Sequence, residues 1–259
     1  MEIVPICHRV DARCEGQNTL TYSATNPPSP SHKIIKMSLT TVQIPAIAKH
    51  TATVVFMHGL GDSGHGWYPV GEMLAPRLPH IKWIFPNAPN QPVTLNGGAK
   101  MPSWYDIVAL NAFAKEDKVG LLASSKCITD LISNEVKGGI PADRIVLGGF
   151  SQGAVIALLG GLTSNSTYAG LVALSGYLAL RTEIQQLKTT ANDSTPIFMG
   201  HGYEDEVVNY EYGKMSSEFL KTELHANVDF KTYRGIGHST HPKELEDLTA
   251  FLGKVLPTI

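Results

Sequence analysis

Apolar residues recur along the chain in two patterns that alternate from about residue 41 to the C-terminus. Short runs rich in β-branched residues predict buried strands, and stretches with apolar residues three or four positions apart predict helices. The predicted strands span residues 41–47, 53–57, 81–85, 144–147, 168–174, 196–199 and 228–233, and the predicted helices span residues 65–78, 117–136, 154–159, 210–224 and 241–255. Strands that alternate with helices imply right-handed parallel crossovers, so we expect an α/β fold with helices on both faces of a mostly parallel sheet.

Two segments depart from this alternation. Residues 1–36 are rich in Ser, Thr, Asn and Pro and show no usable period, so we interpret them as a disordered N-terminal extension, with Met37 as an alternative start. Residues 37–259 are expected to form a single domain. Residues 86–103 are predicted to be a long loop rich in Pro, Asn and Gly, and such loops inside a domain are usually functional or disordered.

Composition and charge exclude several classes of function. The net charge of −2 comes from mixed signs without a basic cluster, so nucleic-acid binding is not expected. No run approaches the ~18 apolar residues of a membrane-spanning helix, and the first thirty residues lack the apolar core of a secretion signal. The 3 cysteines indicate neither a disulfide framework nor a metal site. We therefore expect a soluble protein of the cytoplasm, with the nucleus as an alternative location.

The sequence RIVLGGFSQGAVIALLGG, residues 144–161, contains the clearest candidate for catalytic chemistry. A β-branched run is followed by Gly148 and Gly149, and an apolar helical run begins at Ala154. The pentapeptide from Gly149 to Gly153 fits G-x-S-x-G, the nucleophile elbow of serine hydrolases. Because the predicted strand, turn and helix are the setting that the motif requires, Ser151 is the candidate nucleophile and an ordinary turn is the alternative.

Polar sequence follows the later predicted strands as well. Ligands and chemistry in open α/β sheets collect beyond the carboxyl ends of the strands. Ser151, Asp205 and His238 all follow strands, and they occur in the chain order of nucleophile, acid and histidine that α/β-hydrolases use. A serine hydroxyl is a poor nucleophile unless an imidazole accepts its proton, and a carboxylate must orient that imidazole.

Several acids compete for the carboxylate role. Glu204 and Glu206 flank Asp205, and we favour the shorter Asp205 because it precedes an apolar pair that is expected to pack inward. Asp62 and Asp106 lie on other loops, but neither follows the elbow in the required order. The alternative is a solvated acidic loop.

Among the 10 histidines, His238 is the candidate base, because it lies one residue after the Gly-Ile-Gly that leaves the final strand. His241 precedes a proline at the predicted start of the last helix, where histidines are often surface groups. His58 and His201 each precede a glycine at a strand end. We expect both of them to be structural, with hydrogen bonds to the backbone of their loops.

Acyl transfer also requires two donors for the oxyanion of the tetrahedral intermediate. In this fold one donor is the backbone N–H after the nucleophile, which belongs to Gln152, and the other comes from a loop after an early strand. The sequence HGLG fits that loop, and Leu60 is the expected donor because Gly59 and Gly61 permit an unusual backbone.

With these motifs assembled, the chain resembles the acyl-protein thioesterase and small carboxylesterase family of cytosolic serine hydrolases, which have the α/β-hydrolase fold. The resemblance runs from about residue 51 to the C-terminus and depends on FMHGLGDSGHGW, FPNAPNQPVTLNGGAKMPSWYD, RIVLGGFSQG, LSGYL, HGYEDEVV and GIGHS. It implies the same triad and oxyanion donors as the reasoning from the residues. One departure is Gly153-Ala154-Val155, where the family commonly has Gly-Gly-Ala, so the extra methyl groups must fit between helix and sheet.

The resemblance further implies hydrolysis of the thioester that links palmitate to protein cysteines, without a cofactor. It also implies acylated substrates such as G-protein α subunits, weaker activity on lysophospholipids, and a weak homodimer as a possibility. Two rival interpretations are a carboxylesterase or lysophospholipase acting on small esters or lysolipids, and a non-catalytic binding protein with the hydrolase fold.

Substrate selectivity is expected to come from an acyl groove, because the same triad serves thioesters and oxygen esters. Each buried methylene contributes about 0.8 kcal/mol. We expect the long loop to form part of this groove, with the ordinary packing of a long loop as the alternative. The candidate substrate-binding residues are Pro92, Val93, Leu95, Met101 and Trp104.

Overall fold

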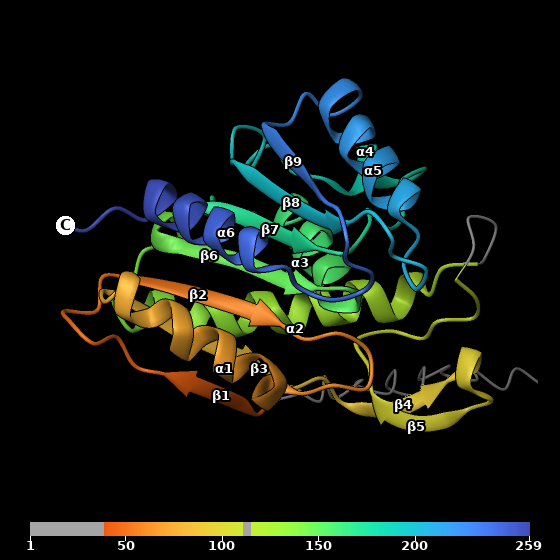
Figure 1. Cartoon of the computed structure of the whole chain (residues 1–259), viewed down its shortest axis with the longest axis horizontal. Coiled ribbons are helices and arrows are strands. Elements are labelled where there is room, and N and C mark those ends of the chain that lie inside the picture. Colours follow the sequence, from red (N-terminus) through yellow and green to blue (C-terminus); the bar gives the residue numbers. More distant parts are fainter. Residues whose placement is uncertain (1–38, 111–114) are drawn as a thin grey trace, which may run out of the picture. The chain divides into compact units, whose positions relative to one another are not determined.

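The computed structural model describes residues 39–110 and 115–259, so the predicted extension at residues 1–36 lies outside the described residues. Seven strands of the described part form one sheet in the order β1-β3-β2-β6-β7-β8-β9 (Figure 1). At one edge β1 (Thr41–Ile44) pairs antiparallel with β3 (Ile81–Pro86). The remaining strands pair in parallel: β2 (Ala52–Met57), β6 (Ile145–Phe150), β7 (Gly170–Leu174), β8 (Ile197–Gly202) and β9 (Val228–Tyr233).

Helices cover both faces of this sheet (Figure 1). One face packs against α1 (Gly64–Leu74) and α6 (Pro242–Val255), and the other packs against α2 (Lys118–Lys137), α3 (Gln152–Leu162) and α5 (Tyr210–Thr222). The mostly parallel sheet with two helical layers confirms the predicted α/β fold. No helix in residues 39–110 and 115–259 is long and apolar enough to cross a membrane.

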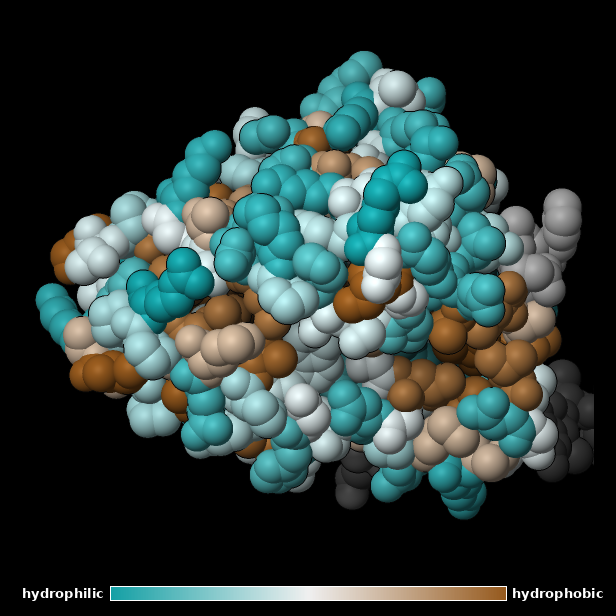
Figure 2. Space-filling view, viewed as in Figure 1, coloured by the Kyte–Doolittle hydropathy of each residue, from teal (hydrophilic) through white to brown (hydrophobic). Residues whose placement is uncertain are grey.

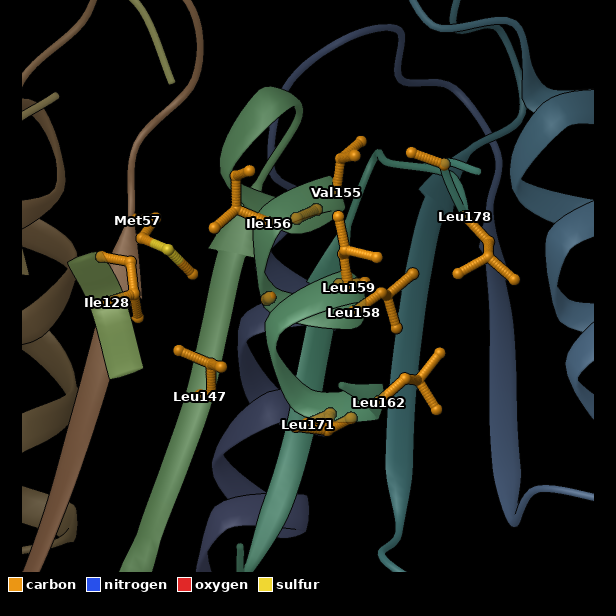
Figure 3. Close-up of a cluster of buried hydrophobic side chains, with 14 of the residues drawn as sticks. Met57, Ile128, Leu147, Val155, Ile156, Leu158, Leu159, Leu162, Leu171 and Leu178 are labelled. Carbon is orange, nitrogen blue, oxygen red and sulfur yellow. The ribbon is translucent and has the colours of Figure 1, made fainter. Parts of the chain in front are cut away.

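The central strands divide the core into two apolar clusters because successive side chains of a strand point to opposite faces. In β2, Val54 and Phe56 belong to the cluster beneath α1 and α6, whereas Val55 and Met57 belong to the cluster beneath α2 and α3. Helix α3 is buried along its whole length. Figure 3 shows its leucines in one apolar cluster with Leu147 of β6 and Leu171 of β7. This packing fixes the start of α3 relative to the strand ends.

The prediction of an irregular loop at residues 86–103 was wrong. The segment contains a hairpin, in which β4 (Asn90–Val93) pairs antiparallel with β5 (Ala99–Pro102) across the 3₁₀ turn η2 (Thr94–Asn96). Each strand includes a proline, which disfavours strands from sequence alone. A two-stranded ribbon accommodates proline because each strand leaves one side unpaired.

Smaller differences concern the ends of elements and the short turns. The predicted edge strand at residues 41–47 ends at Ile44, before the proline that follows it. The chain also contains a one-turn helix α4 (Ile184–Leu187) that the sequence pattern does not predict. Two further 3₁₀ turns, η1 (Ala75–Arg77) and η3 (Ala142–Arg144), follow α1 and precede β6.

Candidate active site

Ser151 occupies a sharp turn between β6 and α3. Its backbone has φ 54° and ψ −118°, a conformation that a residue other than glycine rarely adopts. Glycines on either side allow the strand, the turn and the helix to come together. A Cβ at Gly149 would lie 2.3 Å from the carbonyl carbon of Gly153, and a Cβ at Gly153 would lie 2.3 Å from the oxygen of Met57. The G-x-S-x-G spacing is therefore a steric requirement of this turn.

His238 connects Ser151 to Asp205. Its Nε2 lies 2.8 Å from Ser151 Oγ, and its Nδ1 lies 2.7 Å from Asp205 Oδ2. An ionised carboxylate can only accept, so the proton of the neutral ring belongs on Nδ1 and Nε2 is free to accept the serine proton. The imidazole also packs on the ring of Phe150, with the ring centres 4.8 Å apart. Three side chains from distant parts of the sequence thus form one hydrogen-bonded chain.

The Asp205 carboxyl is buried and fully hydrogen-bonded. Its Oδ1 accepts the N–H groups of Val207 and Val208 at 3.0 and 2.9 Å, which leaves Oδ2 for the imidazoles. Burial raises the pKa of Asp205. The contacts from His201 and His238, the charge of His238 and the Val208 N–H outweigh that effect and hold the pKa well below its usual range. The group is therefore an anion at any pH near neutrality.

The neighbouring acids have other surroundings. Glu206 is exposed, whereas Glu204 Oε2 accepts the N–H groups of Gly235 and Ile236 at 2.9 and 3.1 Å. Glu204 thus ties the loop of the acid to the loop of His238, a role that the sequence did not reveal because the partners lie far apart in the chain. Of the other two acids, Asp62 is exposed and Asp106 accepts both the N–H and the hydroxyl of Thr94.

Two backbone N–H groups lie beside the serine without an acceptor in residues 39–110 and 115–259. They belong to Leu60 and Gln152, the residues expected to stabilise an oxyanion. Leu60 lies in a turn closed by the Asp62 N–H on the Gly59 oxygen at 3.3 Å, and Gly61 has φ 77°. A Cβ at Gly59 would lie 3.3 Å from the Cβ of Ser151, so this turn lies against the elbow.

The side chain of Gln152 has a second role that the sequence did not indicate. It is buried, and its Oε1 accepts the N–H of Trp104 at 2.8 Å. Its Nε2 donates to Ser103 Oγ and to the Tyr105 carbonyl at 2.9 and 2.8 Å. The residue whose backbone N–H faces the site is therefore held from its side chain by the segment that follows β5.

The two histidines that precede glycines differ in their partners. Among the described residues, the ring nitrogens of His58 hydrogen-bond only to backbone groups, the Gly59 oxygen and the Ala88 nitrogen. His201 Nε2 lies 2.9 Å from the Val208 oxygen and 3.3 Å from Asp205 Oδ2. The expectation of hydrogen bonds to the backbone agrees with the partners of the His58 ring nitrogens, but it misses the contact between His201 and the Asp205 carboxylate.

The candidate groove residues lie on and beside the β4–β5 hairpin. Val93 and Trp104 are buried in the interior, with exposures of 0% and 1%. Trp104 Nε1 donates to the His58 oxygen at 2.9 Å. Pro92 and Leu95 are exposed, and Met101 is half-buried near Gly61.

A cavity opens next to this hairpin rather than within it. Its walls come from the segment after Trp104, the turn after β7, and the start of α5 with the loop before it. The lining includes Tyr105, Ile107, Val108, Leu110, Tyr177, Leu178, Val207, Val208 and Met215. Val207 and Val208 are the residues whose N–H groups bind Asp205, so one wall of the cavity belongs to the same loop as Asp205.

The described residues contain no group of three or more His, Cys, Asp or Glu side chains suited to a metal ion. The chemistry that this arrangement can perform is acyl transfer through a serine ester. Ser151, His238 and Asp205 form one hydrogen-bonded chain, and the backbone N–H groups of Leu60 and Gln152 lie beside it, which is the arrangement that such chemistry requires.

Comparison with known proteins places the chain in a family of hydrolases. The profile of the phospholipase/carboxylesterase family matches residues 39–256. A Neurospora crassa protein named acyl-protein thioesterase 1 is 48% identical over 83% of this chain and 91% of its own length. A Mycosarcoma maydis protein of the same name is 49% identical over 81% of this chain and 93% of its own.

Solved structures lead to the same family. The crystal structure of Zea mays acyl-protein thioesterase 2 superposes with a TM-score of 0.77 and 33% identity, over 84% of this chain and 99% of that one. The match of the family profile to most of the chain, the identities near one half and this structural similarity agree. The chain belongs to the phospholipase/carboxylesterase family of α/β-hydrolases.

Proposed function

We propose that the protein is an acyl-protein thioesterase, a serine hydrolase that removes long-chain acyl groups such as palmitate from protein cysteines. The observation that carries the proposal is the hydrogen-bonded chain from Ser151 through His238 to Asp205, beside two amides that have no acceptor in the part of the chain that the structure describes. The names of the relatives support the substrate class. Particular substrates, such as acylated G-protein α subunits, are expected from the family resemblance alone. A cytoplasmic location is likewise part of the proposal, supported by the sparse cysteines.

The proposed reaction has two halves. His238 accepts the hydroxyl proton of Ser151 as Oγ attacks the thioester carbonyl, and the N–H groups of Leu60 and Gln152 stabilise the oxyanion. The C–S bond then breaks, the cysteine thiolate leaves and takes up the proton held by the His238 imidazolium, and the serine is left acylated beside a neutral imidazole. His238 then deprotonates a water molecule that attacks the serine ester, which releases the fatty acid and restores the hydroxyl.

The leaving group makes thioesters favourable substrates for this site. A cysteine thiol has a pKa near 8.5, so a thiolate departs with little help from a general acid. An alkoxide requires a proton from His238 at the same moment. The same groups therefore serve both bonds, and the acyl chain and the protein part of the substrate must provide selectivity.

We assign the acyl chain to the cavity that adjoins the triad. Its apolar walls include Ile107 and Leu178, and the exposed side chains of Val108, Leu110 and Val207 lie at its rim. Figure 2 shows apolar side chains gathered at the edge of the molecule where the chain leads into α2. Burying a methylene contributes about 0.8 kcal/mol, so a long acyl chain gains several kcal/mol from such a surface.

Hydrolysis of lysophospholipids or small carboxylic esters is the second candidate, favoured by the description of the matching family. A fluorophosphonate probe first tests whether the protein is a serine hydrolase. We expect the probe to label the wild type and not Ser151→Ala, and a wild type that resists labelling would indicate a non-catalytic binding protein. Rates on a palmitoylated peptide thioester, a lysophospholipid and an acetyl ester then rank the substrates. A preference for acetyl ester would overturn the proposal.

A matched pair of variants separates the cavity from the hairpin as the acyl site. Ile107 lines the cavity, and its carbonyl accepts the N–H of Leu95 on the hairpin at 2.7 Å. Ile107→Trp is expected to shift the preference toward shorter acyl chains, whereas Leu95→Trp leaves it unchanged. The opposite result would favour the hairpin groove. Deletion of residues 94–98 with an unchanged preference would remove the hairpin from the acyl site.

A further inference from the structure

His201 is a buried imidazole that the proposed reaction does not use. It lies in β8, four residues before Asp205, and it is 1% exposed. Its Nε2 faces two acceptors, the Val208 oxygen at 2.9 Å and Asp205 Oδ2 at 3.3 Å. The same Oδ2 accepts the N–H of His238 at 2.7 Å. The carboxylate oxygen that orients the catalytic imidazole therefore lies between two histidines.

The opposite edge of the His201 ring fixes which nitrogen carries the proton. A Cβ at Gly213 of α5 would lie 2.3 Å from Nδ1, so this nitrogen faces the glycine backbone at close range. A proton on Nδ1 would find no acceptor among the described residues, whereas a proton on Nε2 finds two. The edge of the ring also meets Tyr210 of α5, with the ring centres 5.9 Å apart. Packing from α5 thus directs the Nε2–H toward the acid.

Val208, in the loop after β8, contacts both Asp205 and His201. The Val208 N–H donates to Asp205 Oδ1, and the Val208 oxygen accepts from His201. Asp205 has no freedom to rotate without breaking contacts to the backbone or to an imidazole. A carboxylate held in this way presents one oxygen to His238 in a fixed direction, which preorganises the triad before substrate binds.

We propose that His201 is a positioning residue that holds the Asp205 carboxylate against His238, an inference that rests on the catalytic roles proposed above. The titratable groups nearest to it are Asp205 on its own loop and Tyr210 from α5. His238 lies across the carboxylate, and Glu244 from α6 contacts Gly200, the residue before His201. The His201 N–H withdraws negative charge from Asp205 Oδ2. It therefore also weakens the electrostatic attraction between this carboxylate and a protonated His238.

Two substitutions separate positioning from packing. His201→Leu removes the N–H and keeps an apolar side chain, whereas the amide of His201→Gln can place an N–H near the position of Nε2. We expect His201→Leu to lower kcat about 10-fold with little change in KM, and His201→Gln to restore most of it. The acid limb of the kcat/KM profile is expected to move up by about 0.5 pH unit in His201→Leu, because Asp205 then attracts the imidazolium proton more strongly.

The same assays include Asp205→Asn, so that the two proposals can fail separately. If Asp205→Asn retains activity, the catalytic role proposed for Asp205 fails, and the positioning role of His201 fails with it. If it loses activity while His201→Leu keeps the kcat and pH profile of the wild type, only the positioning role fails. If His201→Leu and His201→Gln lose kcat equally and the kcat/KM pH profile does not move, His201 contributes only packing, and the positioning role fails. In the wild type, nitrogen-detected NMR of labelled histidine must show the His201 proton on Nε2, and a proton on Nδ1 would overturn the inference even if both variants unfold.

Discussion

The dipeptide His-Gly occurs directly after β2 and again at the end of β8, and the two histidines contribute differently to the candidate site. We call these two places the β2 end and the β8 end, each with the loop that follows. At β2, His58 Nδ1 lies 2.7 Å from the Gly59 oxygen, and the Ala88 N–H donates to Nε2 at 3.0 Å. The proton of His58 therefore resides on Nδ1. At β8, His201 directs Nε2 toward Val208 and Asp205. One histidine fixes a backbone turn, and the other contacts the carboxylate that we propose to be catalytic.

The two ends therefore differ in whether their contribution to the site depends on the identity of a side chain. The β2 end offers a main-chain N–H at Leu60, which any side chain except proline preserves. The β8 end offers the Asp205 side chain, whose chemistry no other residue reproduces in the same place. Substitutions at the β8 end are therefore expected to change the identity of a catalytic group, and those at the β2 end to change its geometry.

The largest effect is expected from Asp205→Asn at the β8 end. The amide can donate to His238 Nδ1, which favours the tautomer that cannot accept the serine proton. We expect kcat to fall about 10⁴-fold with the thermal midpoint little changed. Steady-state hydrolysis of a palmitoyl thioester measures this loss, and burst labelling with a fluorophosphonate checks the serine. Near-normal turnover would mean that another acid, such as Glu204, serves the imidazole.

At the β2 end, Leu60→Pro is expected to remove one oxyanion donor and leave the turn intact. The positive φ of Gly61 at the third position and the Asp62-to-Gly59 hydrogen bond describe a type II turn, which favours proline at the second position. We expect a loss of roughly 10²–10³ in kcat, the usual cost of one such donor. Leu60→Ala keeps the N–H and is the control. Equal rates for the two variants would show that this amide does not face the oxyanion.

Local sequence predicts the β2 end and the elbow well because their partners are close in the chain or belong to the backbone. The strand, the glycines and the helix around Ser151 lie within one short segment. The acid and the base follow from chain order and from their place after a strand. These rules select the candidate residues without any knowledge of the sheet order.

The parts that sequence does not predict depend on partners that are distant in the chain. Glu204 binds backbone groups around Ile236, and the Gln152 side chain binds the segment at Trp104. The contact of His201 with Asp205 depends on how α5 packs over β8. The β4–β5 hairpin was missed because its prolines suggest a loop. In each case the tertiary arrangement decides what the local pattern leaves open.

The glycines of the two His-Gly pairs allow a matched pair of substitutions, for which we expect losses of activity smaller than those above. A Cβ at Gly202 would lie 2.4 Å from the Gly237 oxygen, so Gly202→Ala must push away the loop that carries His238. A Cβ at Gly59 would meet the Cβ of Ser151 at 3.3 Å, which small shifts can relieve. We expect Gly202→Ala to lower kcat about 100-fold and Gly59→Ala less than about 10-fold. Kinetics with circular dichroism as a folding control measure both, and the reverse order would refute the comparison.

The smallest effect on activity and the most specific effect on stability are expected from Glu244→Gln on α6. Glu244 is 1% exposed, and its Oε2 accepts the His241 N–H at 3.3 Å. Its Oε1 has no partner among the described residues and lies against Gly200 of β8. Burial raises the pKa of this carboxyl to about 7. The folded protein therefore keeps a proton that the unfolded chain releases at lower pH.

The sign of the pH dependence follows from linkage between protonation and folding. The contribution of Glu244 to stability is complete below its unfolded pKa of 4.5 and is lost as pH rises to about 7. Glutamine resembles the protonated acid at every pH, so Glu244→Gln is expected to be more stable than the wild type at pH ~8, by about 3 kcal/mol at most, and equal to it near pH ~4.5. Burial lowers the pKa of His58 at the β2 end, which gives the opposite slope, with stability lost as pH falls below 6.5. Urea unfolding across this range measures both slopes, and a constant difference between wild type and Glu244→Gln would show that Glu244 remains charged in the fold.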